Sequence, residues 1–320
     1  MLAVCSINGG LMNLRDLRYL VAVADKRHFG RAAEACFVSQ PTLSAQIKKL
    51  EGFLGVQLIE RSNRRVMLTP IGDEVAQRAR YILSAADDIV QVARAASDPL
   101  AGDFRLGLIP TVAPYLLPHL VPAVRESLPR LRLMLYEEQT SRCLERLRNG
   151  TLDAAVLAVP VDGGEGFAQA GLYDEPFLLA MPKGHALSKA RVPSLERLSD
   201  ARILLLEEGH CLRDQALEIC KLVGASEERE FRATSLETLR QMVAAGAGIT
   251  LLPELAALST DGIANAGSIT IERFDSPQPR RHVALLWRKG SAREPTMRAL
   301  VAQVQELDVI QRLQHDDAAA

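Results

Sequence analysis

The sequence predicts an α/β protein built in three successive parts: a small helical head, one long helix, and a larger domain in which strands alternate with helices. Three observations lead to this prediction. Basic residues are concentrated near the N-terminus, a heptad pattern of apolar residues follows, and beyond Phe104 short apolar runs alternate with amphipathic segments. Such alternation is typical of α/β domains, whereas a heptad pattern indicates a helix that packs along its length.

Composition narrows the class of protein. The chain has 320 residues, of which 48% are hydrophobic, so it can bury the cores of at least two domains. No apolar run reaches the ~20 residues that span a bilayer, and the segment Met1–Met12 lacks the pattern of a signal peptide. We therefore expect a cytoplasmic protein with no membrane partner, in which paired cysteines are catalytic or redox-sensing. The five cysteines lack metal-ligand spacing, so neither a metal nor a cofactor is expected.

The head is basic although the whole chain is nearly neutral. The segment Asn13–Arg65 contains ten Lys and Arg residues against five Asp and Glu, while the net charge of the chain is −1. A basic head on an otherwise acidic chain indicates that the head binds a polyanion.

Helical spacing predicts a first helix over Leu14–Lys26 and a short second helix over Arg31–Cys36. After a tight turn, Ser39 is a natural N-cap for a third helix that ends near Leu54. Two helices joined by a tight turn, the second with a polar and basic outer face, form a helix-turn-helix that fits the major groove of double-stranded DNA. A strand pair over Leu58–Thr69 would be a wing that contacts phosphates. The alternative is an ordinary three-helix domain with a solvated charged surface.

The residues that we expect to contact DNA lie on the outer face of the third helix, before it, and at the tip of the wing. They are Arg31, Ser39, Gln40, Pro41, Thr42, Ser44, Gln46, Lys48, Lys49, Arg61, Arg64 and Arg65.

The long helix is predicted by apolar residues at spacings of four and three: Val75, Ala79, Ile82, Ala86, Ile89 and Ala93. A heptad pattern of this kind favours dimerisation, because paired recognition helices require two-fold related half-sites. Packing against the larger domain is the alternative. The segment Asp98–Gly102 ends the helix and marks a hinge.

In the larger domain, strands are expected at Phe104–Ile109, Leu131–Glu137, Ala154–Val159, Phe177–Met181, Ile203–Leu206, Glu230–Ala233, Ile249–Leu252, Ile269–Arg273 and His282–Trp287. Helices are expected at Tyr115–Ser127, Ser141–Asn149, Ser235–Ala245 and Arg293–Glu306. This alternation predicts mostly parallel sheets. A return crossing near Arg280 would divide the domain into two subdomains with a cleft between them.

Cys211 and Cys220 lie nine residues apart in a segment that is predicted to be helical. Nine helical residues rise about 13.5 Å, whereas a disulfide needs Cα atoms within about 7 Å. Either the thiols never meet, or the segment unfolds to join them and acts as a redox switch. The first turn of a helix favours a thiolate by about 0.3–1 kcal/mol, and Arg213 adds a cation. The alternative is that both cysteines are small core residues.

The head resembles a known family. Arg31-Ala32-Ala33-Glu34, Val38-Ser39-Gln40-Pro41-Thr42-Leu43-Ser44, Leu50-Glu51 and Leu54-Gly55 are similar to the winged helix-turn-helix of LysR-type transcriptional regulators. The resemblance implies a DNA-binding domain over residues 12–70, a linker and dimerisation helix over 71–98, and a two-subdomain α/β regulatory domain over 99–310 that is similar to periplasmic binding proteins. Subdomain I would cover 99–171 and 280–310, and subdomain II 172–279. Residues 1–11 would be a disordered extension and 311–320 a flexible tail.

A second resemblance concerns the cysteine segment. The runs 204–216 and 231–240, with the Cys-x8-Cys spacing, are similar to the peroxide-sensing members of this family. The resemblance implies that Cys211 is the peroxidatic thiol and Cys220 the resolving thiol. It implies a peroxide pocket formed by Thr111, Thr140, His210, Arg213 and Arg281, with the neighbouring Arg280 as the alternative arginine. The two threonines could instead cap helices. Cys36 and Cys143 are expected to be core residues.

The resemblance therefore implies a hydrogen-peroxide-responsive regulator of oxidative-stress genes, not an enzyme, that is switched by a reversible Cys211–Cys220 disulfide. It further implies homodimers and homotetramers, contact with RNA polymerase, and reduction by glutaredoxin or thioredoxin. Two alternatives are a LysR-type regulator that responds to a small organic ligand in the cleft, and a thiol peroxidase.

Overall fold

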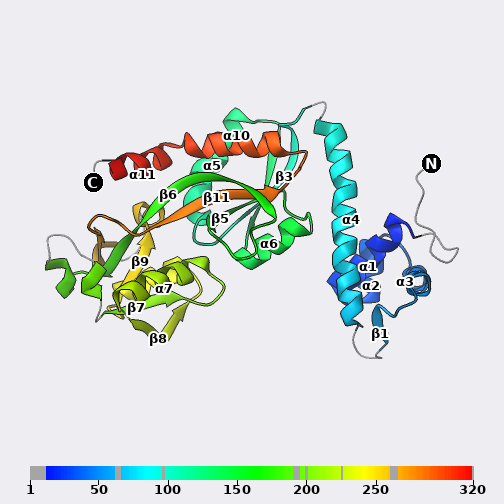
Figure 1. The fold of residues 1–320 in the computed structure, drawn as a ribbon, viewed down its shortest axis with the longest axis horizontal. Coiled ribbons are helices and arrows are strands. Elements are labelled where there is room, and N and C mark those ends of the chain that lie inside the picture. The colour runs from blue at the N-terminus through cyan, green and yellow to red at the C-terminus, as the bar shows by residue number, and fades with distance from the viewer. Residues whose placement is uncertain are drawn as a thin grey trace. The chain divides into compact units, whose positions relative to one another are not determined.

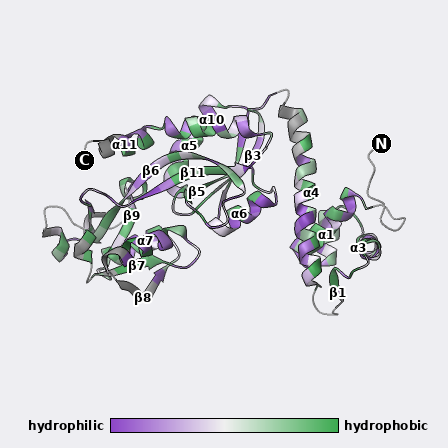
Figure 2. Cartoon of the chain, in the orientation of Figure 1, coloured by the Kyte–Doolittle hydropathy of each residue, from purple (hydrophilic) through white to green (hydrophobic). Residues whose placement is uncertain are grey.

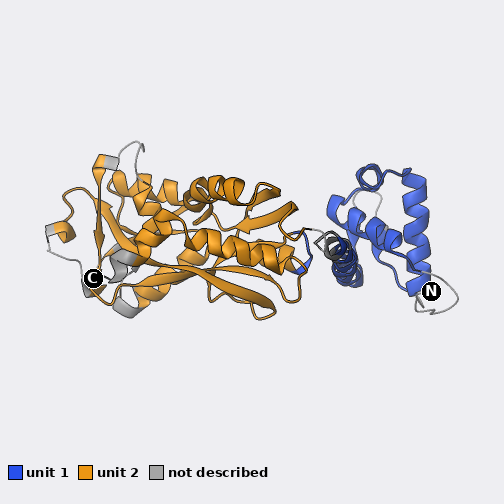
Figure 3. Ribbon diagram, turned by 90° about the horizontal axis from the view of Figure 1, so that it is seen from above, with its two compact units in different colours: residues 1–93, 148–151 blue, residues 94–147, 152–320 orange. Residues whose placement is uncertain are grey.

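The computed structural model describes residues 12–61, 66–95, 98–189, 195–198, 201–224, 226–259 and 266–318. The chain divides into an N-terminal unit, residues 1–93 with 148–151, and a C-terminal unit, residues 94–147 with 152–320 (Figure 3). The expected extension at residues 1–11 lies outside the described residues.

The N-terminal unit contains three helices and a hairpin: α1 (Leu14–Lys26), α2 (Phe29–Ala35), α3 (Gln40–Leu54), β1 (Ile59–Arg61) and β2 (Val66–Leu68). The helix α2 begins two residues earlier than expected, because the His28 ring caps it by accepting a hydrogen bond from the Arg31 N–H at 3.3 Å. Ser39 caps α3 as expected, through the Thr42 N–H at 3.3 Å. Leu20, Leu43 and other apolar side chains of the three helices form the core of this unit.

The long helix α4 (Pro70–Ala95) begins against this core. Gly72 allows the close approach, since a Cβ atom there would lie 2.0 Å from the Leu58 carbonyl oxygen. Ala76 and Ala79 are each 1% exposed, but Ile82 is 41% and Ile89 71% exposed. The heptad pattern is thus buried only over the first turns, and the N-terminal unit leaves an apolar stripe of α4 uncovered among its described residues.

The C-terminal unit contains a seven-stranded sheet in the order β10-β6-β11-β5-β3-β4, with β9 also paired to β6 (Figure 1). Its strands are β3 (Gly102–Leu108), β4 (Leu131–Glu137), β5 (Ala154–Val159), β6 (Phe167–Pro182), β9 (Thr250–Pro253), β10 (Ile269–Arg273) and β11 (Arg280–Arg288). The strand β3 runs parallel to β4 and β5, whereas β9, β10 and β11 run antiparallel to β6. The expectation of mostly parallel sheets is therefore wrong for this part, because β11 runs antiparallel to both of its neighbours, β5 and β6.

The strand β6 is 16 residues long, although the sequence predicted only Phe177–Met181. Its first half pairs with β11 and its second half with β9 and β10. The prediction missed the first half because Asp174 and Glu175 interrupt the apolar pattern there. A separate parallel pair consists of β7 (Arg202–Leu206) and β8 (Ser226–Ala233). Ile203 of β7 also forms a bridge with Ile249, the residue before β9.

The remaining helices are α5 (Ala113–Ser127), α6 (Thr140–Arg148), α7 (Cys211–Val223), α8 (Leu236–Ala244), α9 (Glu254–Leu258), α10 (Glu294–Gln305) and α11 (Asp308–Ala318), with 3-10 turns at Ala186–Lys189, Leu195–Leu198 and Ala266–Ser268. The sequence did not predict α9 or α11. The tail, which was expected to be flexible from residue 311, is helical to Ala318, because Ile310 and Leu313 are buried in the core. Figure 2 shows the apolar character of the central strands. Among the described helices, none is long and apolar enough to cross a bilayer.

Candidate functional site

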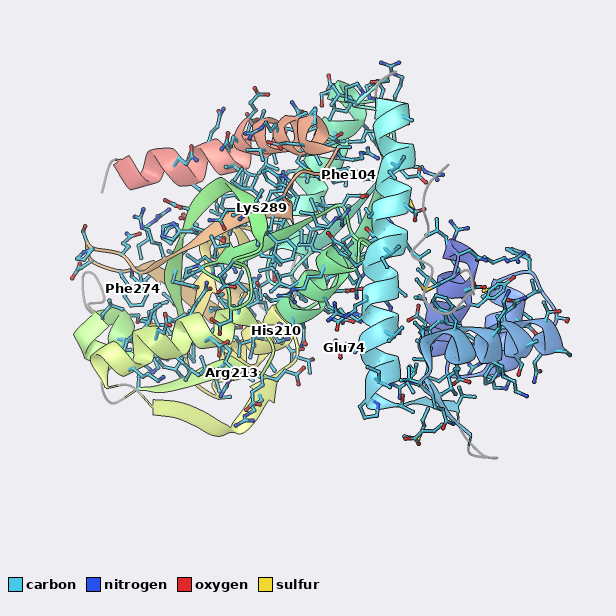
Figure 4. All side chains as sticks on the ribbon, turned by 45° about the vertical axis from the view of Figure 1, so that its right-hand side comes forward. Glu74, Phe104, His210, Arg213, Phe274 and Lys289 are labelled. Atoms are coloured by element: carbon cyan, nitrogen blue, oxygen red, sulfur yellow. The ribbon has the colours of Figure 1, made fainter. Side chains whose placement is uncertain are left out.

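Cys211 is the first residue of α7 and lies at the end of a short loop that leaves β7. It carries a free thiol and is half-buried. Two hydrogen bonds of Arg213 tie the first turn of α7 to both ends of that loop. The Arg213 guanidinium donates to the Leu206 carbonyl at 3.1 Å, and the Arg213 N–H donates to the His210 carbonyl at 2.9 Å. Figure 4 labels His210 and Arg213 in this part of the molecule.

The loop before Cys211 lies against the beginning of α6. Gly209 has a φ of +96°, and a Cβ atom at this position would lie 2.7 Å from Oε1 of Gln139. Thr140, which follows Gln139, is 9% exposed, and its hydroxyl has no hydrogen-bond partner among the described residues. Thr140 does not cap α6 through its side chain, because it is the first helical residue. The loop that precedes Cys211 therefore lies close to Thr140, which was predicted for the pocket.

Arg281 on β11 is held between two other residues of the site. Glu175, its direct partner on β6, accepts from Nε at 2.8 Å and from Nη2 at 2.7 Å. On the other side, Nη1 donates to the Thr111 hydroxyl and Nη2 to the Thr111 carbonyl, both at 3.1 Å. Thr111 thus binds the arginine and does not cap α5, whose N-cap is Val112. Arg281 is 2% exposed whereas Arg280 is exposed, so Arg281 is the arginine that faces Thr111.

The charges of this cluster act on one another. Burial lowers the pKa of Arg281, but the electrostatic interactions with Glu175, Tyr173 and Cys211, together with the hydrogen bond to Glu175, outweigh it and raise the pKa above its ordinary value. The Arg281 guanidinium therefore stays protonated and lies within electrostatic reach of Cys211. In such a buried site the attraction between a thiolate and a guanidinium is stronger than in water.

His210 is 5% exposed, beside the thiol in the sequence. Burial lowers the pKa of its imidazole, and the nearby Glu207 carboxylate opposes this only partly. The ring is therefore neutral at pH 7 and can donate one hydrogen bond, while Arg281 supplies the positive charge.

The other cysteines differ in their surroundings. Cys220 belongs to the unbroken helix α7, and its side chain lies outside the described residues. Cys143 is fully buried, and burial, followed by the Glu138 charge, raises the pKa of its thiol to about 12. Cys36 is half-buried, and burial raises the pKa of its thiol as well. Cys143 therefore remains a protonated thiol in the core, as expected from the sequence.

The residues expected at DNA lie in the N-terminal unit. Ser39 and Thr42 are hydrogen-bonded to each other through their hydroxyls at 2.8 Å at the start of α3. The side chains exposed around and along α3 are those of Arg31, Gln40, Pro41, Thr42, Lys48 and Lys49, while Ser44 and Gln46 are half-buried. The side chain of Arg61 and the residues Arg64 and Arg65 lie outside the described part of the chain.

Sequence reasoning missed three residues of the candidate site. Glu175 and Gln139 are polar residues in segments without a motif, and only the pairing of β6 with β11 and the contact with Gly209 reveal them. A signal for Gly209 was available, because a glycine immediately before a helix often has a positive φ that other residues avoid.

Comparisons with known proteins agree on the family. Residues 14–73 match the bacterial regulatory helix-turn-helix protein family, lysR family, and residues 97–308 match the LysR substrate binding domain. The chain belongs to the LysR family. This LysR-family chain is 46% identical over 283 residues to the DNA-binding transcriptional dual regulator OxyR of Escherichia coli (strain K12), over 88% of this chain and 90% of that protein. LysR proteins are transcriptional regulators, so the chain is a regulator and not an enzyme.

Solved structures of LysR regulators show the same fold. Full-length OxyR from Pseudomonas aeruginosa, in a variant form, matches with a TM-score of 0.78 at 39% identity, over 94% of this chain and 97% of that one. An OxyR mutant from Corynebacterium glutamicum, solved with hydrogen peroxide bound, matches with a TM-score of 0.63 at 34% identity, over 94% and 93%. The predicted architecture, a LysR-type DNA-binding domain followed by an α/β regulatory domain, is confirmed.

Proposed function

We propose that this protein is a hydrogen-peroxide-responsive transcriptional regulator whose signal is received at Cys211. The observation that carries the proposal is the half-buried free thiol at the start of α7, within electrostatic reach of the Arg281 guanidinium that binds Thr111. The similarity to OxyR of Escherichia coli and to a peroxide-bound OxyR mutant supports it.

The first chemical step is oxidation of Cys211. The thiolate attacks one oxygen of hydrogen peroxide, an S–O bond forms, and the O–O bond breaks. The sulfur loses two electrons and becomes a sulfenic acid, while the departing hydroxide takes a proton and leaves as water. Arg281 stabilises the negative charge that passes from sulfur to the departing oxygen, and the hydroxyls of Thr111 and Thr140 orient the peroxide. The neutral ring of His210 donates a hydrogen bond and takes up no proton at pH 7.

The second step is the proposed disulfide. The Cys220 thiol attacks the sulfenic sulfur, the S–O bond breaks, and one water molecule leaves. Cys211 and Cys220 are nine residues apart on one continuous helix, so their Cα atoms are separated by about 13.5 Å along its axis. A disulfide needs about 7 Å or less, so α7 must unwind at least in part. This unwinding is the conformational signal, and a glutaredoxin or thioredoxin reduces the disulfide and restores the helix.

The disulfide changes the way in which the two DNA-binding domains of a dimer bind the operator. The exposed stripe that includes Ile82 and Ile89 supports dimerisation through α4, because such a stripe is normally covered by a partner. The residues proposed to contact bases and phosphates are those that surround α3, together with Arg61, Arg64 and Arg65 of the wing. We propose that dimers assemble into tetramers in the cytoplasm and that the oxidised form contacts RNA polymerase.

Thiol trapping with peptide mapping tests this proposal. Protein prepared in anaerobic reductant receives a brief pulse of low-micromolar peroxide, and the free thiols are then alkylated. We expect a rapid, reversible link between Cys211 and Cys220, a sulfenic acid without that link in Cys220→Ser, and no oxidation of this segment in Cys211→Ser. Two unreactive thiols at many times this dose would refute the proposal, and the signal of this LysR regulator would then be a small ligand.

A further inference from the structure

Glu175 is a fully buried carboxylate in the middle of β6, 0% exposed. A buried carboxylate is costly unless its oxygens are paired. Both oxygens of Glu175 are used. One accepts from Nε and Nη2 of Arg281, and the other accepts from the Leu255 N–H at 2.7 Å, in the first turn of α9.

These bonds set the direction of the arginine. Glu175 occupies the edge of the guanidinium formed by Nε and Nη2, and this leaves Nη1 directed to the Thr111 hydroxyl. An arginine bonded along one edge by a carboxylate cannot rotate without breaking two charge-assisted bonds. Because Glu175 and Arg281 are direct neighbours across β6 and β11, the register of the two strands holds both ends of the pair.

We propose that Glu175 is a positioning residue for the reaction of Cys211 with peroxide, and that it acts by holding the Arg281 guanidinium against Thr111. This inference rests on the proposed function. The role proposed for Glu175 is exerted through Arg281. In the oxidation step, where the S–O bond forms, the O–O bond breaks and hydroxide departs, it keeps the stabilising cation in place and takes no part in the transfer of protons or electrons.

A second role of Glu175 is structural, because it binds the start of α9. The neighbouring Glu254 offers a matched control. It is a carboxylate that is 1% exposed, it is paired with an arginine, Arg273, and it belongs to α9 itself. Replacing Glu254 removes a buried carboxylate from the same region and leaves the pair of Glu175 with Arg281 in place.

The experiment compares wild type, Glu175→Gln and Glu254→Gln as reduced full-length protein. Rapid mixing with hydrogen peroxide gives the second-order rate constant for loss of the Cys211 thiol, and iodoacetamide gives its rate of alkylation across pH. We expect Glu175→Gln to slow the peroxide reaction at least tenfold, with less than a threefold change in alkylation. We expect Glu254→Gln to lower thermal stability without slowing either reaction.

A folded Glu175→Gln with a wild-type peroxide rate would overturn the inference, as would equal slowing in Glu254→Gln. If Glu175→Gln does not fold, Glu175→Asp decides the question. This variant keeps the charge but has a side chain that is shorter by one methylene group. We expect it to slow the peroxide reaction several-fold, and an unchanged rate would count against the positioning role. Failure of the proposed function would be recognised separately, because Cys211 of the wild type would then not react.

Discussion

Replacing Gly209 is expected to shift the proposed equilibrium between the Cys211–Cys220 dithiol and its disulfide, because the loop before Cys211 needs glycine at this position. Its φ of +96° is accessible to glycine but strained for alanine, and a Cβ atom would also lie 2.7 Å from the end of the Gln139 side chain. Gln139 can rotate away, so the backbone determines most of the effect of Gly209→Ala. Strain of this kind costs about 1–3 kcal/mol.

This cost falls on the reduced state, in which α7 is intact and the loop is fixed. If the disulfide form remodels the loop, the substitution favours oxidation by the same free energy. For a two-electron couple 1.4 kcal/mol corresponds to about 30 mV, so we expect the reduction potential of Gly209→Ala to be about 20–60 mV more negative. The variant should then be oxidised to a greater extent than the wild type at the same buffer potential.

The assay is equilibration in glutathione buffers of defined potential, followed by alkylation of the remaining thiols. Gly290→Ala is the matched control, because its φ is +75° and there is open space at its Cβ position, in the turn that follows β11. It should lose stability without a shift in potential. An unchanged or less negative potential for Gly209→Ala would refute the view that the loop is remodelled on oxidation.

Three further predictions concern other residues. Cys143→Ala should retain the peroxide rate of the wild type in rapid-mixing measurements, because burial keeps the Cys143 thiol protonated with a pKa of about 12; slower oxidation of Cys211 would contradict this. Burial lowers the pKa of His210, so below about pH 6.5 the unfolded chain binds a proton that the folded chain does not. Stability should therefore fall as pH falls through this range, and urea midpoints should show a shallower fall for His210→Gln; identical slopes would exclude His210 as the cause. Phe37 is 96% exposed at a φ of +55°, so Phe37→Asn should raise the free energy of unfolding of the N-terminal unit by about 1 kcal/mol in urea, whereas a loss would mean that the ring has a packing role.

The helices of the head were predictable because local signals define them. The first helix was predicted from its helical spacing with the observed bounds, Leu14–Lys26, and in the structure Asn13 and Asp16 form a capping box at its start. The error at the start of α2 arose because histidine is an uncommon cap. Helix α7 was predictable from its amphipathic spacing, and its start at Cys211 decides the geometry of the thiol.

Long-range pairing was not predictable in the same way. The sequence indicated Thr111 and Arg281 only through a family resemblance, and nothing local connects residues that lie 170 positions apart. Glu175 was not identified at all, because a carboxylate in an alternating strand has the pattern of a solvent-facing residue. Its burial follows from the register of β6 with β11, which is a property of the folded sheet.

The place of β11 has a consequence for the synthesis of the protein. This strand comes late in the chain, yet it lies between β5 and β6 in the middle of the sheet. Until residues 280–288 have left the ribosome, the facing edges of β5 and β6 have no partner, and unpaired strand edges promote aggregation. Arg281 also arrives with this strand, so a nascent or truncated chain already carries Cys211 but lacks the arginine. The DNA-binding domain is made first, whereas the arginine proposed to assist Cys211 is present only when nearly all of the chain has been translated.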